Sequence, residues 1–132
     1  MDRIEKRLGL IFSLRRISLN NVLSEFGLIY EDFQIIRVLR YVDGASIEEL
    51  KDKTNYDLKL VEIVIQNLLK KELIIIQDQK ICLTSKVKKL YPIIKRKIKE
   101  VDEKVIAEIP QEEVQQIIET LDKLIEYYDI EK

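Results

Sequence analysis

Residues 46–83 read SIEELKDKTNYDLKLVEIVIQNLLKKELIIIQDQKICL, and this stretch decides the fold. Ser46 and Glu49 have the spacing of a capping box, in which the serine hydroxyl accepts from the Glu49 N–H and the glutamate carboxylate accepts from the Ser46 N–H. Asn55 stands where a tight turn between helices needs a left-handed backbone, which asparagine adopts more readily than most residues. Asp57 is a good cap for a following helix. The stretch therefore predicts two short helices joined by a tight turn.

The second of these helices is predicted to be amphipathic. Its apolar residues recur at helical spacing and are expected to pack on the rest of the domain; they are Val61, Val64, Ile65 and Leu68. The opposite face points outward and carries Lys59, Glu62, Ile63, Gln66 and Lys70.

Two β-rich runs follow, at residues 73–77 and 80–83, with Asp78-Gln79 between them. This spacing predicts a hairpin, although the Asn-Gly or Asp-Gly pair typical of a tight hairpin is absent. Helix, turn, helix and hairpin in this order are the parts of a winged helix-turn-helix. The predicted fold class is mainly α with a short β-hairpin.

Helices are also predicted on both sides of this unit. Apolar residues recur at helical spacing over residues 2 to about 23, and Gly27 is a stop signal before a helix that starts at Tyr30. Thr84 is expected to cap a long helix that reaches about residue 108, with a bend at Pro92, and a last helix covers residues 111 to about 128.

Composition limits the classes of function. The chain has 132 residues, 46% of them hydrophobic, which suffices for one domain or one domain with an extension. It has no His and one Cys, Cys82, which we expect in the core, a redox role being the alternative. No Gly-rich phosphate loop or cluster of metal ligands is present, so we predict no enzyme activity, no metal site and no cofactor. The longest apolar runs fall short of the roughly 20 residues that span a bilayer and no signal peptide is evident, which predicts a cytoplasmic protein.

Charge is distributed unevenly along the chain. Residues 84–99 hold seven basic residues and no acid, whereas residues 100–132 hold eleven acids and three lysines. The basic run is either a solvated helix face or a surface that meets phosphate, and the sequence leaves both interpretations open.

The terminal helices carry more apolar surface than a domain of residues 28–90 could cover. Because a soluble monomer rarely exposes such a patch, we predict a symmetric homodimer in which residues 1–27 and 91–132 form a helical dimerisation region. A monomer with its terminal helices folded back is the alternative. The predicted interface residues are Ile4, Leu8, Ile11, Ile117, Leu121, Leu124 and Ile125.

Several short motifs together resemble the MarR family of winged helix-turn-helix transcriptional regulators. LIYEDF at residues 28–33 is similar to the family's LTPEQF, and LLKKE followed by LII at residues 68–75 is similar to the end of its recognition helix. GASIEEL at residues 44–50, LTSK at 83–86 and IPQEEV at 109–114 also stand where the family has similar segments. The resemblance covers nearly the whole chain, most clearly residues 28–90.

This resemblance implies a cytoplasmic homodimer that binds double-stranded DNA, with the recognition helix in the major groove and the wing in the minor groove. It also implies release by a small, often aromatic, effector, which we expect beside Tyr30, Phe33 or Tyr41. The residues implied to meet DNA are Lys59, Leu60, Glu62, Ile63, Gln66, Asn67, Lys70, Lys80 and Lys86.

The sequence departs from the family at these very positions. Where the family offers Arg, Ser and Thr in the first turns of the recognition helix, this chain has LKLVEI at residues 58–63, and only Lys80 replaces the wing arginine. Glu62 could accept from cytosine, Gln66 and Asn67 could pair with adenine, and apolar side chains could contact thymine methyl groups. Few cations are available to neutralise phosphate, however. A protein-interaction module that docks through Leu58, Leu60 and Ile63 is therefore the alternative function.

Overall fold

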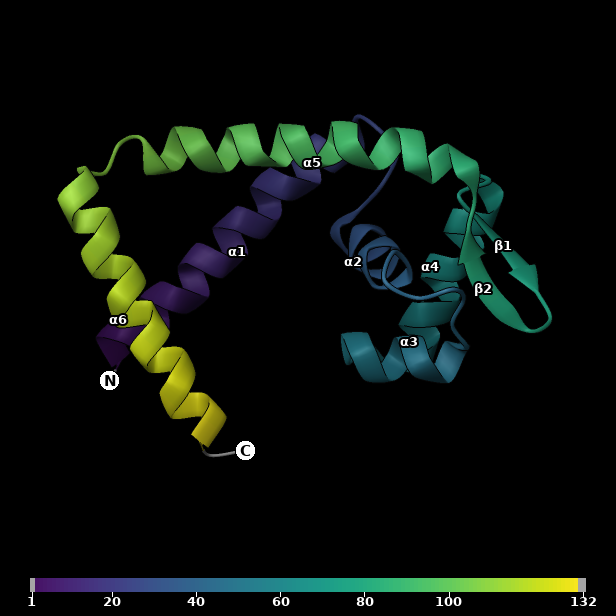
Figure 1. The fold of residues 1–132 in the computed structure, drawn as a ribbon, viewed down its shortest axis with the longest axis horizontal. Helices are drawn as coiled ribbons and strands as arrows, with labels where there is room; N and C mark the ends of the chain where they lie inside the picture. The colour runs from purple at the N-terminus through teal and green to yellow at the C-terminus, as the bar shows by residue number, and fades with distance from the viewer. Residues whose placement is uncertain (1, 131–132) are drawn as a thin grey trace. The chain divides into compact units, whose positions relative to one another are not determined.

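The computed structural model describes residues 2–130, which form six helices and one two-stranded sheet (Figure 1). In chain order the elements are α1 (Asp2–Ser24), α2 (Tyr30–Leu39), α3 (Ile47–Thr54), α4 (Leu58–Lys70), β1 (Ile74–Gln77), β2 (Lys80–Leu83), α5 (Ser85–Ile106) and α6 (Gln111–Ile130). The predicted fold class, mainly α with a short hairpin, is confirmed.

The chain separates into two compact units, one through Lys97 and the other from Ile98 onward. The first unit holds α1 to α4, the hairpin and the first part of α5. Leu19 and Leu23 of α1 are buried in the core of the first unit. Helix α1 is thus part of the body that carries the winged helix. The expected division of the chain at residues 27 and 90 stays a prediction.

The core of the first unit is apolar and draws on every element in it. Helix α2 contributes Phe33, Ile35, Ile36 and Leu39, and α4 contributes Val61, Val64, Ile65 and Leu68. The α4 residues are the ones that the helical spacing assigned to the inner face, so this prediction is confirmed.

The local signals around α3 and α4 act as predicted. The Ser46 hydroxyl accepts from the Glu49 N–H at 3.1 Å, and the Glu49 carboxylate accepts from the Ser46 N–H at 3.5 Å. Asn55 ends α3 in the left-handed conformation at φ 61°, and the Asp57 carboxylate accepts from the Leu60 N–H at 2.8 Å. These contacts fix the angle at which α4 leaves the turn.

The hairpin is a tight two-residue turn. Ile74 pairs with Leu83 and Gln77 with Lys80, which leaves only Asp78 and Gln79 in the turn, at φ 52° and 65°. Positive φ at both positions is typical of a type I′ turn, which suits the twist of paired strands. Ala45 extends the pairing, because its N–H and carbonyl both bond to Ile81.

Two expectations around β2 and α5 are wrong in detail. The Thr84 hydroxyl donates to the Glu72 carbonyl at 2.8 Å, so it ties α5 to the end of α4 and does not cap α5. Cys82 is half-buried and lies at a surface cleft, because alternate residues of a two-stranded sheet point away from the core.

Candidate nucleic-acid interface

The face of helix α4 that is exposed to solvent carries both polar and apolar side chains. Lys59, Glu62, Gln66 and Lys70 are exposed there, as expected from the spacing. Ile63 is 57% exposed, an unusual position for a large aliphatic side chain. Leu60 is half-buried at the edge of this face. The exposed residues of α4 can thus contact a groove edge or an apolar partner.

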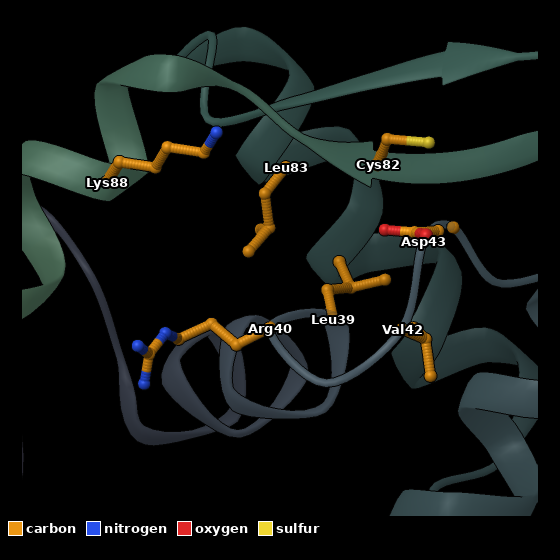
Figure 2. Close-up of a pocket in the computed structure, with 8 residues that line it drawn as sticks. Leu39, Arg40, Val42, Asp43, Cys82, Leu83 and Lys88 are labelled. Atoms are coloured by element: carbon orange, nitrogen blue, oxygen red, sulfur yellow. The ribbon is translucent and has the colours of Figure 1, made fainter.

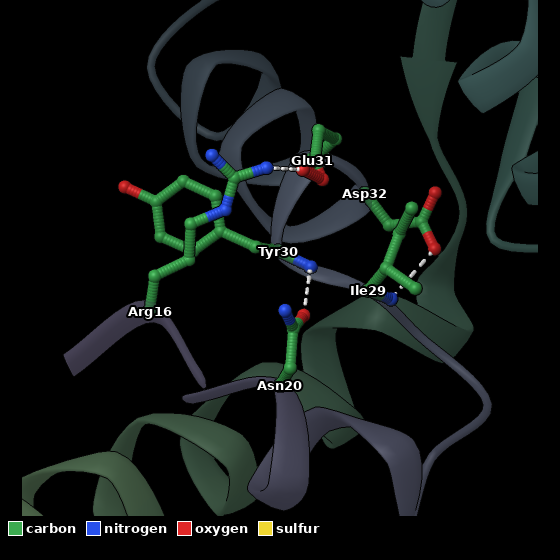
Figure 3. A network of polar contacts seen from close by, with 6 residues as sticks. All are labelled: Arg16, Asn20, Ile29, Tyr30, Glu31 and Asp32. Carbon is green, nitrogen blue, oxygen red and sulfur yellow. Dashed lines mark hydrogen bonds and ion pairs between the residues drawn. The ribbon is translucent and has the colours of Figure 1, made fainter. Parts of the chain in front are cut away.

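Asn67 occupies a different position from its neighbour Gln66. It is half-buried, and its side-chain amide donates to the Asp32 carboxylate at 2.9 Å. The same carboxylate accepts from the Ile29 N–H at 2.9 Å (Figure 3) and is only 1% exposed. The predicted base reader Asn67 therefore connects α4 to the start of α2.

Burial of the Asp32 carboxylate raises its pKa above the usual value, because desolvation disfavours the charged form. The hydrogen bonds from Ile29 and Asn67 and the charge of Lys71 oppose this rise, whereas Glu31 adds to it. Asp32 was not singled out by the sequence, although its place three residues after Ile29 is a helix-capping position that could have been recognised.

The hairpin offers one cation and two apolar side chains to solvent. Lys80 is exposed, as are Ile75 and Ile76 on β1. Lys86 lies close to the hairpin, where its ammonium donates to the Lys71 carbonyl at 3.1 Å, directly after the last residue of α4. The negative end of the α4 dipole stabilises a cation at this position, so Lys86 has a structural role there.

A polar network joins α1 to the first turn of α2 (Figure 3). Arg16 forms an ion pair with Glu31, and the side-chain oxygen Oδ1 of Asn20 accepts from the Tyr30 N–H at 2.8 Å. The Arg16 guanidinium also lies over the Tyr30 ring, 5.0 Å from its centre. Because Arg16 and Glu31 come from separate helices, sequence spacing did not reveal this contact.

The three aromatic residues named as alternatives for an effector site differ in exposure. Phe33 is buried and stacks on Tyr91 with 5.6 Å between ring centres. Tyr41 follows the end of α2 and is 82% exposed, whereas Tyr30 opens α2 and is half-buried beside Arg16. Tyr30 and Tyr41 thus reach solvent whereas Phe33 does not, and the effector site stays a prediction.

An open cleft of about 410 Å³ lies where the end of α2 meets β2 and the start of α5 (Figure 2). Two cations border it, Arg40 and Lys88, on either side of Leu83. Its other lining residues are Leu39, Val42, Asp43, Gly44 and Cys82. Gly44 has φ +107°, and a Cβ there would come within 3.0 Å of the Cys82 sulfur, so this wall of the cleft favours glycine.

Most of the predicted dimer residues are exposed in the single chain. Within α1 these are Ile4, Leu8 and Ile11. Within α6 they are Ile117, Leu121 and Ile125, whereas Leu124 is half-buried. Further large apolar side chains of α1, which were not predicted for the interface, are also exposed; they are Leu10, Phe12, Leu14 and Ile17. None of the helices in residues 2–130 has the length and apolar content needed to cross a membrane.

Comparison with known proteins identifies the fold. Neither a protein-family model nor a curated protein sequence matches the chain. Among solved structures, a MarR transcriptional regulator from Methanosarcina mazei superposes with a TM-score of 0.82 at 22% identity and covers 100% of both chains.

Two further similar structures are complexes with bound molecules. A Staphylococcus aureus MarR in complex with salicylate and kanamycin gives a TM-score of 0.83 at 16% identity, over 99% of this chain and 93% of that one. The Mycobacterium tuberculosis MarR family protein Rv2887 in complex with DNA gives a TM-score of 0.79 at 20% identity, over 91% of this chain and 95% of that one. This chain therefore has the winged-helix fold of MarR-family regulators, as the sequence motifs indicated. These neighbours are transcriptional regulators and not enzymes.

Proposed function

We propose that this chain is a DNA-binding transcriptional regulator that acts as a homodimer. The observation that carries the proposal is the exposed face of α4, held by a capped turn and an inner face of buried aliphatic residues, on a fold shared with a DNA-bound neighbour. Such a helix fits the major groove, where Gln66 can pair with adenine and Glu62 can accept from cytosine. In this arrangement Lys59, Lys70 and Lys80 contact phosphates.

The homodimer is supported by the apolar side chains that α1 and α6 expose. Large exposed apolar patches mark interaction sites on soluble proteins, and a second copy of the chain is the partner that a two-fold DNA site requires. Leu121 and Ile125 lie one helical turn apart on α6, as expected for residues of one contact face.

Release by a small aromatic effector is part of the same proposal. It is supported by the neighbour in complex with salicylate and by the half-buried Tyr30, whose ring lies beside the Arg16–Glu31 ion pair. An aromatic acid would stack on this ring and displace the Glu31 carboxylate from Arg16. Addition of salicylate should weaken DNA binding by the natural protein. An Arg16→Gln variant should lose that response, and an equal response in both proteins would refute this role of Arg16.

A protein-interaction module is the second candidate function. It is favoured by the exposure of Leu58 and Ile63 on α4 and of Ile75 and Ile76 on β1, which place apolar groups where DNA-binding surfaces are usually polar. The two functions differ in salt response. DNA binding weakens steeply as salt rises because counterions are released, whereas contact through apolar surface changes little.

The experiment measures the affinity of the natural protein and of Glu62→Thr for selected and for random duplex DNA over a range of salt. If Glu62 faces phosphate, the variant binds all sequences more tightly. If Glu62 reads cytosine, the variant loses about 1–3 kcal/mol at one base pair. Glu126→Thr on α6 is the matched control, because it removes an exposed carboxylate from a different helix and should change neither affinity nor specificity. Absence of DNA binding by every variant at low salt would favour the protein-interaction module.

A further inference from the structure

The basic run of residues 84–99 forms most of a second charged surface in the first unit. Lys88 and Lys95 are seven residues apart on α5, as are Lys89 and Arg96, so each pair lies on one side of the helix two turns apart. All four side chains are exposed. The inner side of α5 is instead formed by Val87, Tyr91 and Ile94, which are buried.

Arg40 of α2 extends this surface. Its guanidinium lies over the Tyr91 ring at 4.0 Å from the ring centre, which holds it against α5. It borders the same cleft as Lys88 (Figure 2). We call these five residues, Arg40, Lys88, Lys89, Lys95 and Arg96, the α5 basic face.

The charges of the α5 basic face are not neutralised within the part of the chain that the structure describes. Two other cations of α5 have carboxylate partners: Lys97 pairs with Glu25 at 2.8 Å and Lys99 with Glu103 at 3.8 Å. Among the described side chains of residues 3–129, no carboxylate lies within ion-pairing distance of the five cations, although Asp43 lines the neighbouring cleft. Five uncompensated cations on one side of a unit require an anionic partner or bulk solvent.

We propose that the α5 basic face binds the phosphate backbone of DNA without reading sequence, as a second surface in addition to the exposed face of α4. This inference rests on the proposed DNA-binding function. The α5 basic face would supply the cations that the exposed face of α4 lacks. The α4 face and the hairpin offer few cations, and Glu62 opposes them. Because phosphate neutralisation provides most non-specific affinity, a regulator with such a helix needs cations elsewhere.

The dimensions of the face suit a duplex. From Lys88 to Arg96 the helix rises about 12 Å, at 1.5 Å per residue. One strand of a duplex carries about one charge per 3.4 Å of axis, so about three or four phosphates of one strand occupy that length. The face is thus long enough for several phosphate contacts.

A membrane surface fits the face less well. Helices that lie in a membrane interface bury an apolar side beside their cations. In α5 that apolar side is occupied inside the protein, where Val87, Tyr91 and Ile94 pack. The α5 basic face offers charge without an apolar side that could enter the bilayer.

The test uses the full chain and two triple variants with equal charge changes. The first is Lys88→Gln, Lys95→Gln and Arg96→Gln on the α5 basic face. The matched control also neutralises one exposed arginine and two exposed lysines, on α1, α5 and α6; it is Arg3→Gln, Lys104→Gln and Lys123→Gln. Affinity for a long duplex of random sequence and for a selected short duplex is measured against salt. A charge-retaining variant, Lys88→Arg, Lys95→Arg and Arg96→Lys, shows whether charge or fold is responsible.

The α5 triple variant should bind the long random duplex at least tenfold more weakly at low salt, and its log–log salt slope should fall by up to about 2.7, which is 0.9 for each lost phosphate contact. Its base preference on the selected duplex should stay unchanged, and the control and charge-retaining variants should behave as the natural protein. Unchanged affinity and slope, with the selected duplex still bound by the natural protein, would overturn the proposal and leave the DNA-binding function intact. Loss of binding to phosphatidylserine vesicles without any loss of DNA binding would overturn it in favour of a membrane. Failure of the natural protein to bind any duplex would refute both proposals.

Discussion

Replacement of Asn67 by alanine tests whether this residue holds the domain together or reads bases. The side-chain amide of Asn67 donates to the Asp32 carboxylate, which is 1% exposed and also accepts from the Ile29 N–H. A hydrogen bond to a charged group contributes about 1.5–3 kcal/mol. Alanine is the better helix former by about 0.5 kcal/mol, which offsets part of the loss. We therefore expect Asn67→Ala to lower the free energy of unfolding by about 1.5 kcal/mol at neutral pH.

The matched control is Gln66→Ala, one position earlier on the same helix. Gln66 is exposed, so its removal should change the free energy of unfolding by less than about 0.5 kcal/mol. Urea unfolding followed by circular dichroism, at one fixed protein concentration, measures both variants. The effects on DNA binding should be the opposite of the effects on stability: Gln66→Ala should alter base preference and Asn67→Ala should not.

The loss in Asn67→Ala should also depend on pH. The Asn67 amide lowers the pKa of Asp32, so its removal raises that pKa further and makes the charged carboxylate costlier to bury. The destabilisation should therefore be largest at pH 8 and shrink as the pH falls and the carboxyl takes up its proton. Equal stability of the Asn67→Ala and Gln66→Ala variants at pH 8 would refute the structural role of Asn67.

Three further outcomes follow from named residues. Leu121→Asp combined with Leu124→Asp should convert the dimer to a monomer in sedimentation, because unpaired charges would be buried in the interface, and a monomeric natural protein would contradict this account. Asp32 has a raised pKa in the folded state, so its contribution to the free energy of unfolding falls as the pH rises through that pKa. As the pH is lowered from 7 to 4, the natural protein should therefore gain stability relative to the Asp32→Asn variant. A stability difference that stays constant with pH would count against the assignment. Asn55→Ala should cost about 1 kcal/mol because of the left-handed backbone, whereas Asn55→Gly should cost less, as thermal unfolding can show; the reverse order would exclude this explanation.

The local parts of the fold could be predicted because their signals lie within a few residues of one another. The capping box at Ser46, the turn at Asn55 and the inner face of α4 depend on neighbours three or four positions away. Hairpin position was also predictable, although the turn uses Asp78 and Gln79 in place of a glycine pair.

Contacts between distant parts of the chain could not be predicted in this way. Asn67 and Asp32 are 35 residues apart, and Arg16 and Glu31 are 15 apart, so no periodic pattern relates them. The same limit explains why the sequence offered Asn67 as a base reader. On a helical wheel it lies close to the outward residues, and only the packing of α2 against α4 reveals that its amide is engaged.

For the surfaces proposed to bind partners, the sequence could predict the residue types but not the contacts among them. The basic run was visible as seven cations, but the pairing of Lys97 depends on Glu25, which is 72 residues away in the chain. Likewise, the sequence did not show that Phe33 stacks inside the core while Tyr41 is exposed.

Selection of bound sequences from random duplex DNA tests the central claim most directly. A homodimer that inserts α4 into the major groove should enrich a two-fold symmetric site whose half-sites are about 10 base pairs apart, and each selected base pair should cost about 1–3 kcal/mol when changed. Gln66→Ala should shift the preference within each half-site, and Asn67→Ala should leave it unchanged. Recovery of no common sequence, together with no salt-dependent retention of duplex DNA at low ionic strength, would contradict the DNA-binding function.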